Sequence, residues 1–407
     1  MTSRRRFTLF LIYLRQTSAA LLIYQPVFIP FLLGRGMNMI DVALLQTVYN
    51  LGVLAFDIPT GYAADRFGRK WALAGTNLAL AIGTAFLAFG HSLGMFIVAE
   101  LFYSVAIAFD SGTHSAYLFE WLRRQKLESE YYRFDARGTF IFLSASTVGT
   151  FVAGYFAERN LMIPVAATIG LTFIGFPAAC LLPDDGSAED STDARPNAAA
   201  GKRRRHVSPG DIARLARHVL VTPHVRWAAG VTVLWFWARQ YINFIISQPY
   251  FHSINLHFRD YGMLYSVLTL TSGLIAFFSR RFVQTTDLRK LTAAGLLLIP
   301  TCFAIMGLSH TKAGLAGFFL FAVPYGLCAA VTNTLLNRAY TEHDSRATFL
   351  SVVDTAVRLV ASMLALVLGW VLARHGASAA LLCATAVAGA IVVALLPGLR
   401  RYTLQEP

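Results

Sequence analysis

The chain has 407 residues, of which 56% are hydrophobic and only 14% are charged, and its mean hydropathy is +0.53. This fraction of charged residues is too low for the surface of a soluble globular protein. The composition therefore excludes a soluble enzyme or binding module and predicts an all-α membrane protein. A formal net charge of +13 would suit nucleic acid in a soluble chain. Here the Lys and Arg residues lie between apolar runs, as in positive-inside membrane proteins, and we expect no nucleic-acid partner.

Apolar runs that could cross a bilayer recur along the whole chain. A membrane helix needs about 20 predominantly apolar residues. Runs of this kind predict two six-helix bundles, 1–182 and 227–407, joined by a cytosolic linker, 183–226. Within the linker, Ser208 to Leu220 has the periodicity of an amphipathic helix on the inner leaflet. The predicted spans are 7–33, 42–60, 71–90, 94–119, 138–157, 162–182, 227–250, 260–279, 291–308, 313–336, 347–372 and 378–396.

The distribution of basic residues predicts the orientation of these spans. If both termini are cytosolic, the cytosolic segments carry 27 of the 35 Lys and Arg residues and the outer loops carry five. The positive-inside rule therefore predicts two cytosolic termini. The first apolar run carries Arg15 and lacks a small-residue cleavage site, so we interpret it as a retained helix rather than a signal peptide. We expect a bacterial inner membrane as the location.

The segment Asp57 to Lys70 separates the second and third predicted spans and contains turn glycines beside a cluster of cations. It predicts a short cytosolic loop. Gly61 would let the second helix approach a neighbour closely, and Gly68 would permit a tight turn. Asp65 lies ahead of the third span, where a carboxylate can accept backbone hydrogen bonds at a helix N-terminus.

The two halves share a sequence pattern in their first helices. The first helix contains Arg15-Gln16 followed by Gln25-Pro26, and the seventh contains Arg239-Gln240 followed by Gln248-Pro249. Two such pairs at nearly the same spacing indicate a duplicated six-helix unit. Secondary transporters are commonly built in this way.

The predicted loop from Gly61 to Lys70, between the second and third helices of a chain with six plus six helices, resembles the signature of the major facilitator superfamily. That signature is Gly-x-Leu-Ala-Asp-Arg-x-Gly-Arg-Arg/Lys. The chain departs only at Ala63, where the family has Leu. The corresponding loop of the second half, 279–290, keeps its charges but loses both glycines, and the fifth helix lacks the Gly-Pro pair of proton-coupled drug antiporters. The resemblance implies that Asp65 contacts Arg346 at the start of the eleventh helix as a latch. The candidate gating residues are Asp57, Gly61, Asp65, Arg66, Gly68, Arg69, Lys70 and Arg346.

Several charged residues lie within the apolar spans, where an ionised group needs a partner or a cavity. The resemblance implies that helices 1, 4, 7 and 10 line a central cavity, and two cations there would suit an anionic or zwitterionic solute. The alternative is that Arg15 and Arg239 only neutralise Asp57, Glu100 or Asp110. Asp354 and Arg358, at i and i+4, most simply pair with each other. The candidate cavity residues are Arg15, Tyr24, Gln25, Trp235, Arg239, Asn243, Gln248 and Tyr325.

Proton coupling needs a carboxylate that can gain and lose a proton during the transport cycle. Asp110 and Glu100 are the candidates. His114 lies one turn beyond Asp110 and could relay a proton, although a single His within a helix is more often a packed core residue.

We therefore expect a secondary active transporter that moves a small organic solute by alternating access, is coupled to protons, and favours efflux over uptake. The alternatives are an uptake permease for an anionic metabolite and a membrane sensor or scaffold that does not transport. The sequence contains no phosphate-binding loop, nucleophile elbow or metal-binding motif, and its four cysteines show no paired spacing. We expect no enzymatic activity, cofactor or metal, and a monomer in the lipid bilayer.

Overall fold

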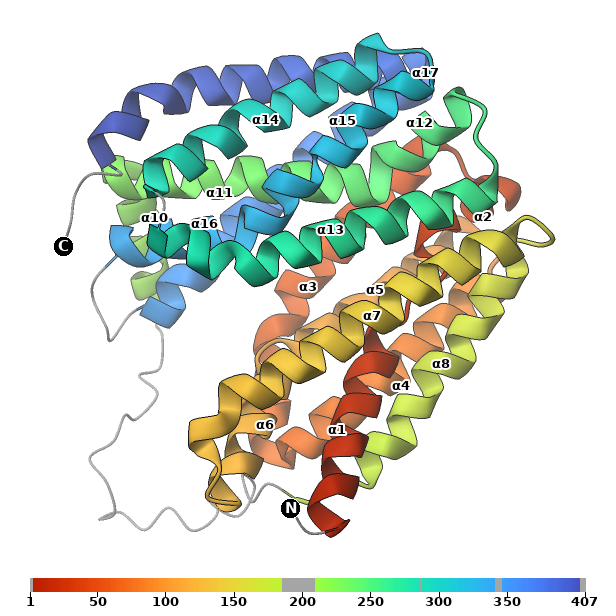
Figure 1. The fold of residues 1–407 in the computed structure, drawn as a ribbon, viewed down its shortest axis with the longest axis vertical. Helices are drawn as coiled ribbons and strands as arrows, with labels where there is room; N and C mark the ends of the chain where they lie inside the picture. The colour runs from red at the N-terminus through yellow and green to blue at the C-terminus, as the bar shows by residue number, and fades with distance from the viewer. Residues whose placement is uncertain (1–2, 185–208, 286, 341–345, 403–407) are drawn as a thin grey trace. The chain divides into compact units, whose positions relative to one another are not determined.

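The computed structural model describes residues 3–184, 209–285, 287–340 and 346–402 (Figure 1). Every regular element in these ranges is helical, with no strand among them, which confirms the predicted all-α class. Part of the predicted linker, 185–208, lies outside the described residues.

Eight α-helices form the chain up to the linker, and two short 3₁₀ turns interrupt them. In two places a break divides a predicted span, within 7–33 and within 94–119. The elements are α1 (Ser3–Ala20), η1 (Gln25–Val27), α2 (Phe28–Gly34), α3 (Met39–Phe67), α4 (Arg69–Phe89), α5 (Leu93–Asp110), α6 (Thr113–Arg124), η2 (Glu128–Glu130), α7 (Tyr131–Ala157) and α8 (Met162–Cys180).

The described chain from residue 209 onward is also helical. It includes one π-helical turn, η3. The elements are α10 (Pro209–Val221), α11 (Pro223–Tyr241), η3 (Ile242–Ile246), α12 (Ser247–Ser253), α13 (Phe258–Thr285), α14 (Leu288–Leu308), η4 (Lys312–Gly314), α15 (Leu315–Leu320), α16 (Ala322–Ala339) and α17 (Arg346–Tyr402).

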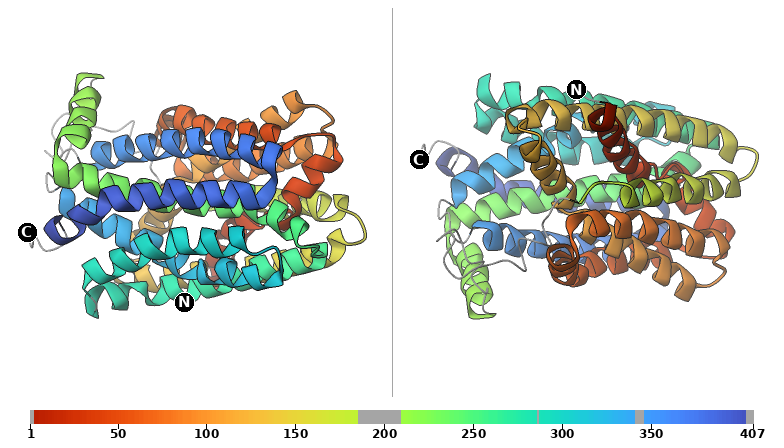
Figure 2. Two further views of the ribbon diagram at one scale, coloured as in Figure 1. Left: turned by 90° about the horizontal axis from the view of Figure 1, so that it is seen from above. Right: turned by 90° about the horizontal axis from the view of Figure 1, so that it is seen from below.

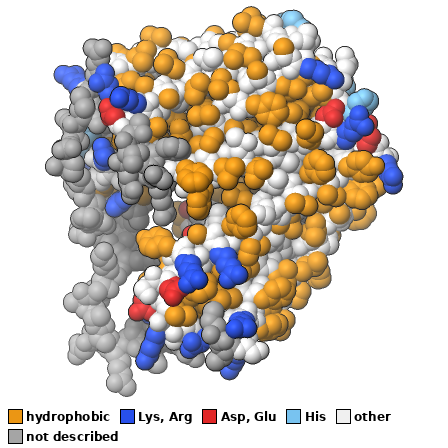
Figure 3. All heavy atoms as spheres, viewed as in Figure 1, with side chains coloured by type: hydrophobic (Ala, Val, Ile, Leu, Met, Phe, Trp, Pro, Cys, Tyr) orange, Lys and Arg blue, Asp and Glu red, His pale blue; other side chains and the backbone are white. Residues whose placement is uncertain are grey.

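The described residues contain ten helices long and apolar enough to cross a membrane, or eleven if the bent pair α10–α11 is one span. The last of them, Thr348–Leu399, has 52 residues, whereas one crossing needs about 20. Gly376 breaks it with a φ of 78°, and the two arms of α17 lie side by side in Figure 2. The expected total of twelve spans remains a prediction. Large hydrophobic side chains are exposed on many helices (Figure 3), as lipid contact requires.

The chain divides into two compact units. The first comprises Met1–Met37, Val48–Gly201 and His257–Ser266, and the second comprises Asn38–Thr47, Lys202–Leu256 and Val267–Pro407. The bundle boundaries expected from the sequence remain a prediction, because each unit also takes a short segment from the other part of the chain.

In the first unit, α4 packs between α5 and α8, and α1 packs against α8 and α7. Tyr117 and Trp121 of α6 are buried in a cluster with apolar residues of α1, α4 and α8. In the second unit, α17 packs along α14 and α11, and α11 packs on α16. Its core contains Trp237 and Tyr241, whose rings contact Phe303 at centroid distances of 5.8 Å.

Small residues allow close helix contacts within each unit. In the first, Gly154 of α7 faces Gly262 of α13, and a Cβ at Gly262 would lie 2.8 Å from the Cα of Gly154. In the second, a Cβ at Gly369 of α17 would meet the side chain of Ala43 of α3. Only residues without a large side chain fit at these contacts.

The predicted loop between the second and third spans is almost entirely helical, which corrects the expectation of a loop. The helix α3 continues to Phe67, α4 begins at Arg69, and Gly68 alone makes the turn with a φ of 94°. A positive φ favours glycine, so the predicted tight turn is confirmed. A Cβ at Gly61 would meet no described atom within 4 Å, so the close approach expected there is not made.

The helix predicted in the linker is present as α10 and meets α11 at an angle of 91°. Leu215 and Val219 are buried, whereas Leu220, expected on the same face, is 67% exposed. The helix α10 contacts α11 and α17.

Candidate substrate and coupling sites

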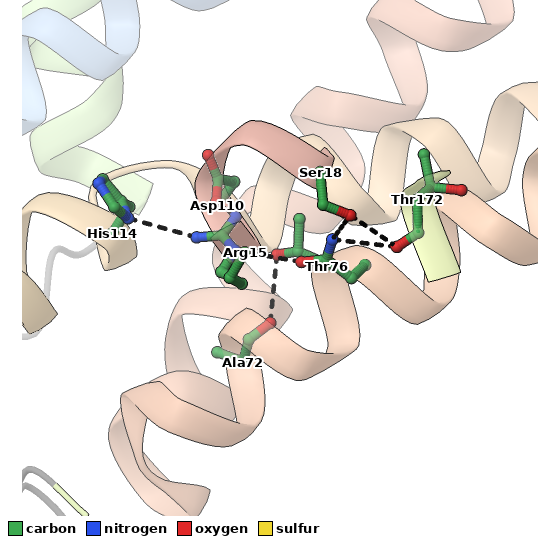
Figure 4. A network of polar contacts seen from close by, with 8 residues as sticks. Arg15, Ser18, Ala72, Thr76, Asp110, His114 and Thr172 are labelled. Carbon is green, nitrogen blue, oxygen red and sulfur yellow. Dashed lines mark hydrogen bonds and ion pairs between the residues drawn. The ribbon is translucent and has the colours of Figure 1, made fainter. Parts of the chain in front are cut away.

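Arg15 of α1 lies at the centre of a polar network in the first unit (Figure 4). Its side chain is 1% exposed and forms an ion pair with Asp110. Its Nε donates to Oδ1 of Asn77 at 3.1 Å, and its Nη1 lies 3.4 Å from Nδ1 of His114. Because arginine has no acceptor, the histidine nitrogen must accept this hydrogen bond. All three nitrogens of the guanidinium therefore have a protein partner.

A break in the fourth predicted span brings Asp110 and His114 to Arg15. The helix α5 ends at Asp110, Gly112 adopts a left-handed φ of 72°, and α6 begins at Thr113. Glycine adopts this conformation without the steric cost that a Cβ would add. The sequence predicted one continuous helix here, so the break is a correction, and it places both side chains beside the same guanidinium.

Asn77 of α4 is a functional candidate that the sequence reasoning missed. Its side chain is fully buried. Besides accepting from Arg15, it donates to the backbone oxygen of Thr172 at 3.2 Å. A Cβ at Gly175 would overlap its amide, so this glycine makes room for it. The available signal was an amide within the apolar run 71–90.

Asp57 and Glu100, the other two carboxylates expected as possible partners of Arg15, lie elsewhere in the first unit. Asp57 is exposed on α3, and Glu100 is buried on α5, where it interacts electrostatically with Tyr24 and Tyr103. The Tyr24 and Tyr103 rings lie 6.3 Å apart. Gln25 begins the short turn η1 after α1 has ended at Ala20. The geometry therefore pairs Arg15 with Asp110.

A second cluster surrounds Arg239 of α11, in the second unit. The guanidinium lies 5.6 Å from the ring centre of Phe236 and 5.9 Å from that of Tyr325 on α16. Asn243 donates to the hydroxyl of Tyr325 at 2.8 Å. Among the described residues, no hydrogen-bond partner is found for Nε of Arg239, which is buried. This cation differs from Arg15 in having no paired carboxylate there.

Arg358 approaches the same aromatic ring. Its guanidinium lies 5.4 Å from the centre of Phe236, and its Nε donates to Asp354 at 2.7 Å. The expected pairing of Asp354 with Arg358 is thus present in the geometry. The sequence reasoning missed Phe236, because an aromatic residue in an apolar helix carries no signal of a charged neighbour.

The backbone around Asn243 is a π-helical turn, η3, rather than a regular α-helix. Pro249 has no N–H and its ring crowds the carbonyl four residues earlier, which favours a wider turn just before it. The hydroxyl of Ser247 donates to the carbonyl of Ile242 at 2.5 Å. In the first half the corresponding Gln25-Pro26 pair follows a complete break in the helix.

Two other expected cavity residues lie in packed surroundings. Trp235 is fully buried, its Nε1 donates to the carbonyl of Pro324 at 2.6 Å, and its ring occupies the space beside Gly295. Gln248 is 2% exposed on α12. The structure thus brings Arg239, Asn243 and Tyr325 together, and it gives Trp235 a packing contact.

The gating residues around Gly68 lie at the surface of the first unit. Asp65 is exposed and belongs to the last turn of α3. The N-cap of α4 is Gly68 and not this aspartate. Arg66 donates to the hydroxyl of Tyr62 at 3.5 Å. Lys70 lies 3.4 Å from Asp184, and Arg69 is half-buried. Arg346 begins α17 in the second unit, and its latch with Asp65 remains a prediction.

The ends of α7 and α13 are joined by a contact that was not anticipated. Glu158 accepts a hydrogen bond from the backbone N–H of Arg259 at 3.2 Å, and its other oxygen lies 3.1 Å from Nδ1 of His257. The carboxylate therefore caps the N-terminus of α13. No group of three His, Cys, Asp or Glu side chains that could hold a metal occurs within the described ranges.

The family model for the Major Facilitator Superfamily matches residues 7–364. The chain belongs to the major facilitator superfamily. It is therefore an integral membrane protein of a family of transporters, as the sequence motif indicated. Among curated proteins, an uncharacterized MFS-type transporter of Bacillus subtilis (strain 168), YxaM, is 23% identical over 142 residues. This match spans 35% of the chain and 35% of YxaM.

Solved structures of other transporters share the fold. A mutant of the nucleoside transporter NupG has a TM-score of 0.79 at 12% identity, covering 98% of this chain and 100% of that one. A peptide transporter, POT, in complex with sulfate has a TM-score of 0.70 at 15% identity, covering 97% of this chain and 95% of that one. At such low identity these likenesses show the fold alone.

Proposed function

We propose that the protein is a proton-coupled secondary active transporter that exports a small organic solute by alternating access. Its family supports transport. The observation that carries the coupling is the ion pair between Asp110, which is 39% exposed, and Arg15, which is 1% exposed. A carboxylate that contacts water on one side and a buried cation on the other can exchange a proton with the water. That exchange changes the charge balance at the buried cation.

Proton uptake at Asp110 would change the network without moving any covalent bond. The protonated carboxyl would no longer balance the charge of Arg15, leaving that cation with the amide of Asn77 and the imidazole of His114. A buried cation without a counter-charge is unfavourable, so the helices that carry these groups would favour a different packing. In this way one proton could bias the equilibrium between two conformations.

The remaining features of the proposal follow the sequence expectations. Both termini would be cytosolic in a bacterial inner membrane, the chain would act as a monomer, and the residues around Gly68 would gate the cytosolic side. Two bundles would rock about a midplane site. Outward transport is the direction to be tested first, with uptake of an anionic metabolite as its alternative.

The test is transport in proteoliposomes with an imposed pH gradient. Nucleosides and peptides, which the structural neighbours are named for, form a first panel together with small organic acids. The gradient should drive accumulation of at least one solute in the wild type. The Asp110→Asn variant should keep exchange of labelled for unlabelled solute but lose accumulation driven by the gradient.

Glu128→Gln, a change at an exposed carboxylate, is the matched control and should retain both activities. Accumulation that persists in the Asp110→Asn variant would disprove this site of coupling. If no solute of the panel moves while some bind, the non-transporting sensor would be the better interpretation.

A further inference from the structure

We propose that Arg239 and Tyr325 bind the carboxylate of a small monoanionic solute. This inference rests on the proposed function, because it assigns the class of solute that the transporter carries. Both residues lie within the second unit, and their positions do not depend on the first.

The first observation is that the guanidinium of Arg239 has no anionic partner among the residues that the structure describes. Its Nε is buried without a hydrogen bond, and no ion pair joins Arg239 to any residue that the structure describes. Its contacts are with two aromatic rings, those of Phe236 and Tyr325. Rings hold a guanidinium in place through its flat face, which leaves the N–H groups at its edge for a planar carboxylate.

The second observation concerns the charge around Phe236. Two guanidiniums, those of Arg239 and Arg358, lie within 5.6 Å of its ring centre, and Arg358 is paired with the carboxylate of Asp354, whereas no ion pair to Arg239 is found among the described residues. This cluster therefore carries one uncompensated positive charge. The cluster around Arg15 in the first unit is balanced by Asp110. A single negative charge on the solute would complete the balance at Arg239, so we expect a monoanion.

The third observation is the direction of the hydrogen bond to Tyr325. Its hydroxyl oxygen accepts from Nδ2 of Asn243 at 2.8 Å. The hydroxyl proton is then available, because the hydrogen bond found for this hydroxyl among the described residues is the one that it accepts from Asn243. A phenol whose oxygen is already used as an acceptor is oriented to donate. Tyr325 and Arg239 thus present donors side by side, as an anion requires.

The experiment compares two anions with their neutral amides, using purified full-length protein in detergent and no gradient. Benzoate and acetate are the anionic probes, and benzamide and acetamide have nearly the same shapes without the charge. We expect at least one of the two anions to raise the thermal unfolding temperature of the wild type, with no effect of either amide. Equal effects of an anion and its amide, or no effect of either anion, would overturn the proposal.

Three variants locate the site. Arg239→Gln should lose the shift, and Tyr325→Phe, which removes only the hydroxyl, should weaken binding about tenfold, the effect of one hydrogen bond to a charged group. Arg226→Gln removes an exposed cation from the same helix and should bind as the wild type does. If Arg239→Gln does not fold, Tyr325→Phe still decides, since unchanged affinity in that variant contradicts the proposal.

These experiments can refute the anion site and the proposed transport independently of each other. Anion binding that depends on Arg239, in a protein that moves no solute, would overturn the proposed transport and leave this site intact. Transport of neutral solutes without any binding of benzoate or acetate would overturn the anion site alone.

Discussion

Replacing Gly262 by alanine should open the contact between α7 and the start of α13. A Cβ at this position would lie 2.5 Å from the carbonyl oxygen of Thr150 and 2.8 Å from Cα of Gly154. Both neighbours are backbone atoms of a helix, so no flexible side chain can move aside. The distance of 2.5 Å must lengthen to at least 3.4 Å, where ordinary van der Waals contact begins.

Overpacking of this kind typically costs about 1–3 kcal/mol. Under the predicted topology the contact lies toward the non-cytosolic side, where the proposed alternating access would require it to break when the transporter opens outward. The hydroxyls of Ser266 and Thr150, 2.8 Å apart, lie in the same interface. If only the closed state makes this contact, Gly262→Ala should shift the population toward the open state by about 5- to 150-fold.

The assay is labelling of a cysteine placed at Ser266, which is 5% exposed, by a maleimide that does not cross membranes. The native cysteines are replaced by alanine first. Gly170→Ala on α8 is the control, since a Cβ there would meet no described atom within 4 Å. The labelling rate should rise in Gly262→Ala and stay at the wild-type value in the control. Equal rates in the two variants would refute the steric reasoning.

Three further predictions concern the first unit. Gly68→Ala should destabilise the protein by about 1–2 kcal/mol because φ at this turn is 94°, and thermal unfolding should show no comparable loss for Gly61→Ala, where a Cβ meets open space. Asn77→Ala should lower the free energy of unfolding by about 1–3 kcal/mol, because it leaves Nε of Arg15 without a hydrogen-bond acceptor. An unfolding temperature equal to that of the wild type would contradict the network. Asp65→Asn should slow transport at unchanged expression, and normal flux in proteoliposomes would argue against the latch.

Much of the helical architecture could be predicted because a bilayer demands long apolar runs. The predicted span 71–90 corresponds to α4, Arg69–Phe89, and 291–308 corresponds to α14, Leu288–Leu308. The prediction of a loop before α4 was wrong, since only Gly68 leaves the helical conformation. Charge and polarity around a glycine do not by themselves end a helix, because polar residues at a membrane surface remain compatible with helical backbone.

The candidate site could be predicted only in part. An arginine or aspartate within an apolar run is conspicuous, so Arg15, Asp110 and Arg239 were found from the sequence. The sequence offered Asp57, Glu100 and Asp110 as equal partners for Arg15, and it gave no reason to choose Asn77 as the acceptor for its Nε.

The sequence by itself determined that the chain is a helical membrane protein, and it contains the motif of its superfamily. Both could be found without the structure because hydropathy and turn glycines are local properties of the chain. Only the tertiary structure decided which buried charges are compensated. The left-handed turn at Gly112 brings Asp110 to Arg15, whereas Arg239 packs against Phe236 and has no paired carboxylate within the described part of the chain. That difference depends on distances between helices far apart in the sequence, which no local pattern encodes.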